Sequence, residues 1–216
     1  MKKNIFLIGF MGAGKSTIAK LLSEKLDMPL IEMDERIVEE QGMPITEIFE
    51  KYGEPHFRDI ETRLVETIGK GNGAIVSCGG GVVVRPENVR MMKESGKIVF
   101  LTATPETIFE RVRYGKDRPI LNGNMNVEYI KGLMEKRRDA YESAADFFVA
   151  TDDKTKETIC EEIIIEIEKI KKEQTLRAVG FEEKCDCILS EMVIDLCRTY
   201  RKNTTIQSPY DRVEAS

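Results

Sequence analysis

The chain has 216 residues, of which 41% are hydrophobic and 33% charged, and its formal net charge is −5. This size and balance predict one substantial globular domain, with or without an appendage. The negative charge argues against general nucleic-acid binding, and no apolar run approaches the roughly 20 residues needed to cross a bilayer. The short apolar run after Met1-Lys2-Lys3 leads into glycines without a cleavage-like site, so we expect a cytoplasmic protein that binds neither membrane nor nucleic acid.

The five cysteines are odd in number and irregularly spaced, which indicates free thiols in a reducing compartment. Cys185, Cys187 and Cys197 could bind a soft metal, although the paired C-x-x-C spacing of such sites is missing. His56 is the single histidine in the sequence, which excludes a histidine-rich metal site.

Short apolar runs alternate with helical patterns along residues 1–172. The expected strands are residues 4–9, 29–33, 74–77, 97–101 and 146–150. The expected helices are residues 15–26, 35–41, 45–51, 58–70, 86–93, 105–114, 126–143 and 155–172. Such strands predict an α/β three-layer sandwich, with a five-stranded parallel sheet and helices on both faces. Residues 173–216 are interpreted as a C-terminal extension with a helix at 182–201 and a frayed tail.

A phosphate-binding motif follows the first expected strand. The segment Gly9-Phe10-Met11-Gly12-Ala13-Gly14-Lys15-Ser16 fits G-x-x-x-x-G-K-[ST] in full and opens an expected helix. The glycines let backbone N–H groups turn inward around phosphates, and the helix N-terminus adds its dipole. We expect Lys15 to reach the β- and γ-phosphates of ATP and the Ser16 hydroxyl to bind Mg²⁺. The motif therefore indicates a P-loop NTPase, and we expect its sheet and helices to be arranged as in the nucleoside monophosphate kinases.

The second expected strand ends in Glu32-Met33-Asp34. Residues i and i+2 of a strand share one side, so both carboxylates can face the same site. Asp34 is a candidate to orient or deprotonate an acceptor hydroxyl, and Glu32 could hold water in the magnesium shell. The alternative for Asp34 is a helix N-cap, and the two roles can coexist.

Arg58 and Glu61 stand at i and i+3 of an expected helix and can pair. A guanidinium held in this way presents a fork to a substrate carboxylate, whereas the alternative is a solvated surface pair. After the third strand, Gly79-Gly80-Gly81 allows a ligand to approach the backbone closely, unless these glycines form only a flexible turn.

Basic residues gather after the helix expected at 105–114. They are Arg111, Arg113, Lys116 and Arg118, around Tyr114 and Gly115. We interpret them as a lid that excludes water and whose arginine neutralises charge on the transferred phosphoryl group. The alternative is a solvated charge run.

In order and without large gaps, residues 3–170 resemble the shikimate kinase family. The segments that carry the resemblance are Gly9 to Thr17 of the phosphate loop, Asp34, Gly53-Glu54-Pro55-His56-Phe57-Arg58 with Glu61, Gly79-Gly80-Gly81, Arg118-Pro119-Ile120-Leu121, and Arg137 with Tyr141. The resemblance implies ATP- and Mg²⁺-dependent phosphorylation of the shikimate 3-hydroxyl, in the biosynthesis of chorismate and the aromatic amino acids.

The resemblance also assigns roles to residues. Those implied to be catalytic are Lys15, Asp34 and Arg118. Those implied to bind ATP are Gly12, Ala13, Gly14, Lys15, Ser16, Thr17 and Arg118. Those implied to bind shikimate are Asp34, Arg58, Gly79, Gly80, Gly81 and Arg137, with the two arginines on the substrate carboxylate.

Two features depart from the family. Glu32 stands where the family commonly has an aspartate, and residues 173–216 exceed the usual family length. A packing or dimerising helix is our interpretation of this extension, so we expect a monomer unless the extension pairs two chains. Two alternatives stay open: another small-molecule P-loop kinase, such as a gluconate or adenylate kinase, and a non-catalytic nucleotide-binding regulatory module.

Overall fold

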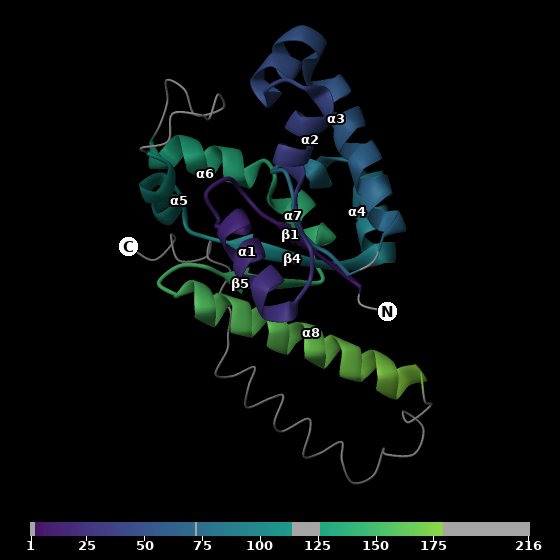
Figure 1. Cartoon of the computed structure of the whole chain (residues 1–216). Coiled ribbons are helices and arrows are strands. Elements are labelled where there is room, and N and C mark those ends of the chain that lie inside the picture. Colours follow the sequence, from purple (N-terminus) through teal and green to yellow (C-terminus); the bar gives the residue numbers. More distant parts are fainter. Residues whose placement is uncertain (1–2, 72, 114–125, 179–216) are drawn as a thin grey trace. The chain divides into compact units, whose positions relative to one another are not determined.

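The computed structural model describes residues 3–71, 73–113 and 126–178 (Figure 1). The chain divides into two compact units, residues 1–162 and 163–216, and all five strands lie in the first. The strands are β1 (Asn4–Ile8), β2 (Leu30–Glu32), β3 (Ile75–Ser77), β4 (Gly96–Thr102) and β5 (Phe147–Ala150). The helices are α1 (Lys15–Leu26), α2 (Met33–Gln41), α3 (Ile45–Lys70), the 3₁₀ turn η1 (Val82–Val84), α4 (Pro86–Ser95), α5 (Pro105–Val112), α6 (Val127–Glu135), α7 (Arg138–Ala144) and α8 (Lys156–Ala178).

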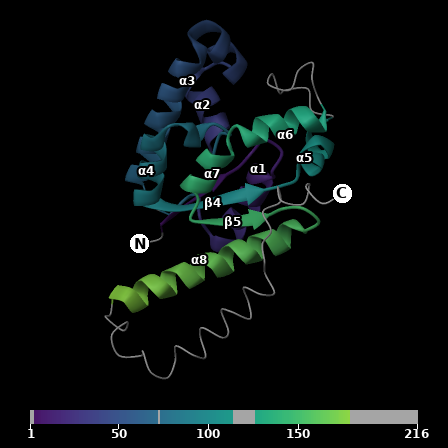
Figure 2. The same ribbon diagram turned by 180° about the vertical axis from the view of Figure 1, so that it is seen from behind.

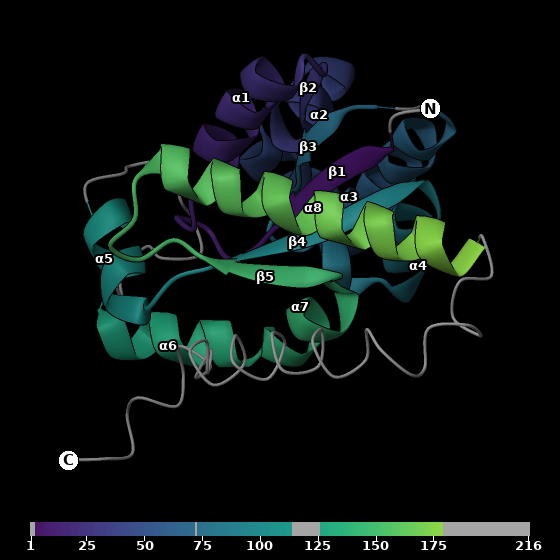
Figure 3. The ribbon, with the colours of Figure 1, turned by 90° about the horizontal axis from the view of Figure 1, so that it is seen from below.

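The strands form one parallel sheet in the order β2-β3-β1-β4-β5, which Figure 3 shows from top to bottom. Parallel register pairs both Leu7 and Glu32 with Ser77, so the carboxyl ends of β1, β2 and β3 meet at one edge. The predicted five-stranded parallel sheet is therefore confirmed. Its order places the phosphate loop after β1 directly beside the glycines that follow β3.

Alternating strand residues bury both faces of the sheet. Phe6, Val76 and Phe100 belong to one core cluster, which α2, α3, α4 and α7 complete. Leu7, Val99 and other residues of opposite parity are equally buried, and α1 packs against β1, β2 and β3. Figure 2 shows α4 and α7 beside β4. Burial on both faces explains why the strands are almost wholly apolar.

The helix that carries Arg58 begins earlier than predicted. Two helices, 45–51 and 58–70, were expected, and α3 (Ile45–Lys70) does consist of two helical segments, which a break at Gly53 (φ 79°, ψ 171°) separates. The second segment starts directly after Gly53 rather than at residue 58. This left-handed φ favours glycine. Pro55 stands in the first turn after the break, where its missing N–H costs no hydrogen bond.

The single helix expected at 126–143 is wrong. The chain forms α6 and α7, and Arg137 lies between them with φ −115° and ψ −2°. The periodicity of apolar residues continues across this break, so the sequence pattern does not reveal it.

At the C-terminal end, α8 extends to Ala178, beyond the expected end at 172. The helix expected at 182–201, the frayed tail and the three C-terminal cysteines lie outside the described residues. The predicted division after residue 172 therefore stays a prediction. In the parts of the chain that are described, no helix is long and apolar enough to cross a membrane.

Candidate active site

The phosphate loop has the backbone that its glycines predict. Gly9, Gly12 and Gly14 have φ values of 147°, 81° and 94°. A Cβ on Gly9 would stand 2.5 Å from the Leu101 carbonyl oxygen, so a side chain has no room there. Lys15 Nζ donates to the carbonyl oxygens of Gly9 (2.8 Å) and Phe10 (3.1 Å), which places its ammonium group over the loop.

Beside this loop, three side chains from separate elements meet. Ser16 Oγ at the start of α1 donates to Glu32 Oε2 (3.1 Å) at the end of β2, and it lies 3.4 Å from Ser77 Oγ at the end of β3. Burial raises the pKa of the Glu32 carboxyl, and hydrogen bonds from Ser77 and Ser16 oppose this shift. The longer side chain of Glu32 thus still brings its carboxylate to the Ser16 hydroxyl.

Asp34 does not share a strand face with Glu32, as was predicted, because β2 ends at Glu32 and Asp34 lies in the first turn of α2. Asp34 is also not the N-cap, since that position belongs to Glu32. Its carboxylate nevertheless faces the site: Asp34 Oδ1 would lie 2.9 Å from a Cβ built on Gly79. A helix start, rather than the end of a strand, therefore positions this carboxylate.

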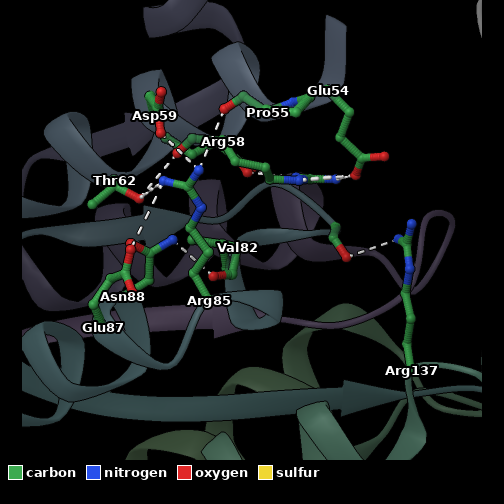
Figure 4. A network of polar contacts seen from close by, with 12 residues as sticks. Glu54, Pro55, Arg58, Asp59, Thr62, Val82, Arg85, Glu87, Asn88 and Arg137 are labelled. Atoms are coloured by element: carbon green, nitrogen blue, oxygen red, sulfur yellow. Dashed lines mark hydrogen bonds and ion pairs between the residues drawn. The ribbon is translucent and has the colours of Figure 1, made fainter.

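Arg58 and Glu61 form a buried pair rather than a solvated one. They are only 8% and 0% exposed, and Arg58 Nη1 donates to Glu61 Oε2. Glu54 Oε1 accepts from Arg58 Nη2 (2.8 Å) and Nε (3.1 Å), as Figure 4 shows. Burial opposes the charge on Arg58, but Glu61 and Glu54 more than offset it, so the pKa of the guanidinium is raised. Two glutamates therefore fix the direction of the guanidinium.

The glycines after β3 are closely surrounded by these side chains. A Cβ on Gly81 would overlap the Arg58 guanidinium, and one on Gly79 would lie 2.7 Å from Glu61 Oε1. A flexible turn is therefore not the whole explanation for three glycines. The backbone N–H groups of Val82 and Val84 donate to the carbonyl oxygens of Gly79 and Gly81, and these bonds continue the turn into η1.

Gly80 connects the phosphate loop with α7. Its carbonyl oxygen accepts from Arg137 Nη1 (3.1 Å) and from the Tyr141 hydroxyl. A Cβ on Gly80 would lie 3.9 Å from the Gly9 carbonyl oxygen and 3.9 Å from Arg137 Nη1. The break between α6 and α7 thus places Arg137 beside the glycine turn, with its guanidinium labelled in Figure 4.

Arg111 differs from its expected place in a lid. It lies in α5, and its Nη1 donates to Thr151 Oγ1 (2.9 Å) and Gly12 O (3.3 Å), while Nη2 donates to Thr151 O (2.9 Å). Arg111 therefore connects the phosphate loop to the segment after β5. Lys116 and Arg118 lie outside the described residues, so the lid stays a prediction.

Most of the expected site residues come together at one edge of the sheet. They are the phosphate-loop residues Gly12, Ala13, Gly14, Lys15, Ser16 and Thr17, with Glu32, Asp34, Arg58, Gly79, Gly80, Gly81 and Arg137. The contacts made by Ser77, Glu54 and Tyr141 were not predicted from the sequence. A polar Ser77 at the end of a buried strand was the one local signal among them.

Known proteins resemble this chain over the same region. Residues 11–168 match the family model described as shikimate kinase. A shikimate kinase of Caldicellulosiruptor bescii is 44% identical over 162 residues, covering 75% of this chain and 94% of that protein. One from Thermodesulfovibrio yellowstonii is 42% identical over 173 residues, covering 80% and 99%.

A solved structure agrees with these relatives. Shikimate kinase from Acinetobacter baumannii, in complex with shikimate, is 29% identical with a TM-score of 0.75, covering 79% of this chain and 96% of that one. The family match ends at residue 168, so the whole of the expected extension, residues 173–216, lies beyond it. On the fold, the phosphate loop and these relatives, the chain belongs to the shikimate kinase family.

Proposed function

We propose that this protein transfers the γ-phosphoryl group of ATP to the 3-hydroxyl of shikimate, as one step in the biosynthesis of chorismate and the aromatic amino acids. The observation that carries the proposal is the position of residues 79–81. This turn lies against the phosphate loop through Gly80 and against Asp34, Glu61 and Arg58 through Gly79 and Gly81. A nucleotide-binding half and a half suited to a hydroxylated carboxylic acid therefore meet at one turn.

The acceptor half has the groups that shikimate needs. Arg58 and Arg137 supply guanidinium groups for its carboxylate, because planar forks bind carboxylates well. Asp34 accepts the proton of the reacting hydroxyl or holds that hydroxyl in line with the phosphoryl group. Backbone groups of Gly80 and Gly81 bind the ring hydroxyls, since a glycine has no side chain of its own to keep a ligand away from its backbone.

The donor half fits ATP with magnesium. Ser16 and Glu32 provide hard oxygen donors, which Mg²⁺ prefers, and the half-buried carboxylate of Glu32 has a raised pKa that a cation would oppose. Ser16 would bind the ion directly and Glu32 through water. A bound Mg²⁺ would neutralise charge on the phosphates during transfer. Lys15 extends over the loop to contact the β- and γ-phosphates.

The remaining parts of the proposal depend on sequence. Arg118 completes the site by contacting the transferred phosphoryl group when the lid closes. Residues 1–172 form the kinase domain, and residues 173–216 form an extension of the monomer or, if they self-associate, a dimer contact. We propose that the protein acts in the cytoplasm on ATP and shikimate.

A coupled assay tests the proposal. Purified protein with Mg-ATP is given shikimate, gluconate or AMP, and ADP release is measured together with the product. We expect turnover with shikimate and a phosphorus NMR signal of the 3-phosphate, and loss of turnover in Lys15→Ala. Phosphorylation of gluconate or AMP without turnover of shikimate would contradict the proposal.

A further inference from the structure

Arg85 occupies a position between the glycine turn and the helix of Arg58. It follows η1 and serves as the N-cap of α4, with extended backbone dihedrals (φ −96°, ψ 118°). Its guanidinium makes three contacts with the part of α3 after the Gly53 break. Nη2 donates to Asp59 Oδ1 (2.7 Å) and Pro55 O (3.3 Å), and Nη1 donates to Thr62 Oγ1 (3.2 Å). Figure 4 shows these contacts.

The spacing of these acceptors shows what Arg85 holds. Residues 55, 59 and 62 stand four and three positions apart, so they form one face of the helix. The Thr62 hydroxyl in turn donates to the Arg58 carbonyl oxygen (3.0 Å). Two successive hydrogen bonds through the Thr62 hydroxyl therefore join Arg85 to the backbone of Arg58.

Two arginines thus join α3 to opposite ends of one short segment. The Arg58 guanidinium lies against Gly81 at the start of η1, and Arg85 holds α3 from the end of η1. Between them Val82 and Val83 are buried, and Asn88 Nδ2 donates to Val82 O (2.9 Å). Because η1 is fixed in this way, the contacts of Arg85 limit how far the helix can move relative to Gly81.

We propose that Arg85 is a positioning residue for the substrate carboxylate, acting by holding the first turns of this helix so that Arg58 stays against Gly81. The inference rests on the proposed function, because it assumes that Arg58 binds that carboxylate. Arg85 is not among the residues of the proposed site, and it acts through Arg58 without contacting ATP or shikimate itself. The geometry assigns it no effect on ATP binding, since its polar contacts within the described structure lie on α3 and, through Nη1 to Glu87 Oε1 (3.8 Å), on α4, and none lies on the phosphate loop.

The test compares Arg85→Met with wild type, using shikimate and its carboxamide analogue as acceptors. Methionine keeps an apolar stem and removes all three contacts. We expect the KM for shikimate to rise roughly tenfold. The KM for the carboxamide, the KM for ATP and kcat should stay within about twofold. Arg85→Lys keeps the charge near Asp59 but cannot reach all three acceptors, so an intermediate KM is expected.

Arg90→Ala is the matched control, because Arg90 is an exposed arginine of α4 paired only with Glu94 among the described contacts. Its KM values should equal those of wild type. A double-mutant cycle with Arg58→Ala completes the test: once Arg58 is absent, Arg85→Met should cause no further rise in the KM for shikimate. Thermal melting of every variant shows whether each one is folded.

Two results would overturn the inference alone. These are equal KM changes for shikimate and the carboxamide, or an additive effect in the double variant, because a purely structural role gives either. An unchanged KM in Arg58→Ala would instead refute the carboxylate clamp of the proposed function, and the inference with it.

Discussion

Glu61 Oε1 and Asp34 Oδ1 converge on one point beside Gly79, at 2.7 Å and 2.9 Å from the position that a Cβ there would take. Glu61 Oε1 is buried and has no hydrogen-bond partner within the described structure. An unpaired buried carboxylate oxygen is costly unless a ligand or another group satisfies it. Two carboxylates facing one space beside the glycine turn suit a substrate that carries several hydroxyl groups.

Gly79→Ala should therefore damage the acceptor site. The new methyl group would press on both carboxylates, and we expect kcat/KM for shikimate to fall about tenfold or more while the KM for ATP is retained. Steady-state kinetics with each substrate varied in turn measures this. Gly132→Ala is the control: Gly132 lies inside α6 with nothing within 4 Å of its Cβ position, so alanine there should leave kinetics unchanged. Equal kinetics in the two variants would show that the space beside Gly79 is not used.

Asp34→Asn removes the charge of the proposed acceptor carboxylate and keeps its size. Loss of a positioned general base costs on the order of 100-fold or more in rate. We expect kcat to fall by that amount while calorimetry shows ATP binding as in wild type. A variant with near-normal kcat would rule out the acceptor role of Asp34.

Glu61→Gln should make the folded protein more stable relative to wild type as pH rises, and it should weaken the binding of shikimate. Burial is the main cause that raises the pKa of Glu61; Arg58 lowers it and Asp34 raises it further. A carboxyl with a raised folded pKa binds more protons in the folded state, so stability falls as pH rises from 4.5 through that pKa. Glutamine does not titrate, so the variant does not lose this stability. The loss in wild type is about 1.4 kcal/mol for each unit by which the folded pKa of Glu61 exceeds the unfolded one.

Urea unfolding of wild type and Glu61→Gln from pH 4.5 to pH 8 checks this prediction. The difference in unfolding free energy should move in favour of the variant as pH rises. The KM for shikimate should increase, because Arg58 loses the charge that orients it. A stability difference that does not change with pH would mean that Glu61 has the same pKa in both states.

Arg111→Met tests the connection between the phosphate loop and the segment after β5. It removes the donors to Gly12 O and to Thr151. We expect the KM for ATP to rise roughly tenfold and the KM for shikimate to stay the same. This is the opposite pattern to Arg85→Met, so the two variants serve as controls for each other. A rise in both KM values would indicate a general loss of folding.

Local sequence patterns predicted the helices and strands well where the residues of a single helix or strand determine its bounds. The helix α1 has the expected bounds, and all five strands are present, because apolar spacing and glycine punctuation act over a few residues. The break at Gly53 falls between the two helices predicted at 45–51 and 58–70, whereas the break at Arg137 was not predicted. Apolar periodicity continues past Arg137, and tertiary contacts of its side chain accompany the break.

Contacts between distant segments could not be derived from spacing. Ser16 and Ser77 are 61 positions apart, as are Gly80 and Tyr141, and Gly12 and Arg111 are 99 apart. Such contacts depend on strand order, which places β3 beside β1. The resemblance to a family supplied the role of Arg137, whereas the glycine turn was predicted from the sequence itself. The resemblance did not assign roles to Arg111, Ser77 or Arg85.

The break at Gly53 makes the rotational position of side chains in residues 54–70 independent of the number of residues in the helical segment before it. Each residue of an α-helix turns the chain by about 100°, so one inserted residue in an unbroken helix would rotate every later side chain. At Gly53 the chain leaves helical dihedrals, so a length change in residues 45–52 can be absorbed before Glu54. The same change in residues 54–57 would turn Arg58 away from Gly81. Variation in length is therefore tolerable on one side of this glycine and harmful on the other.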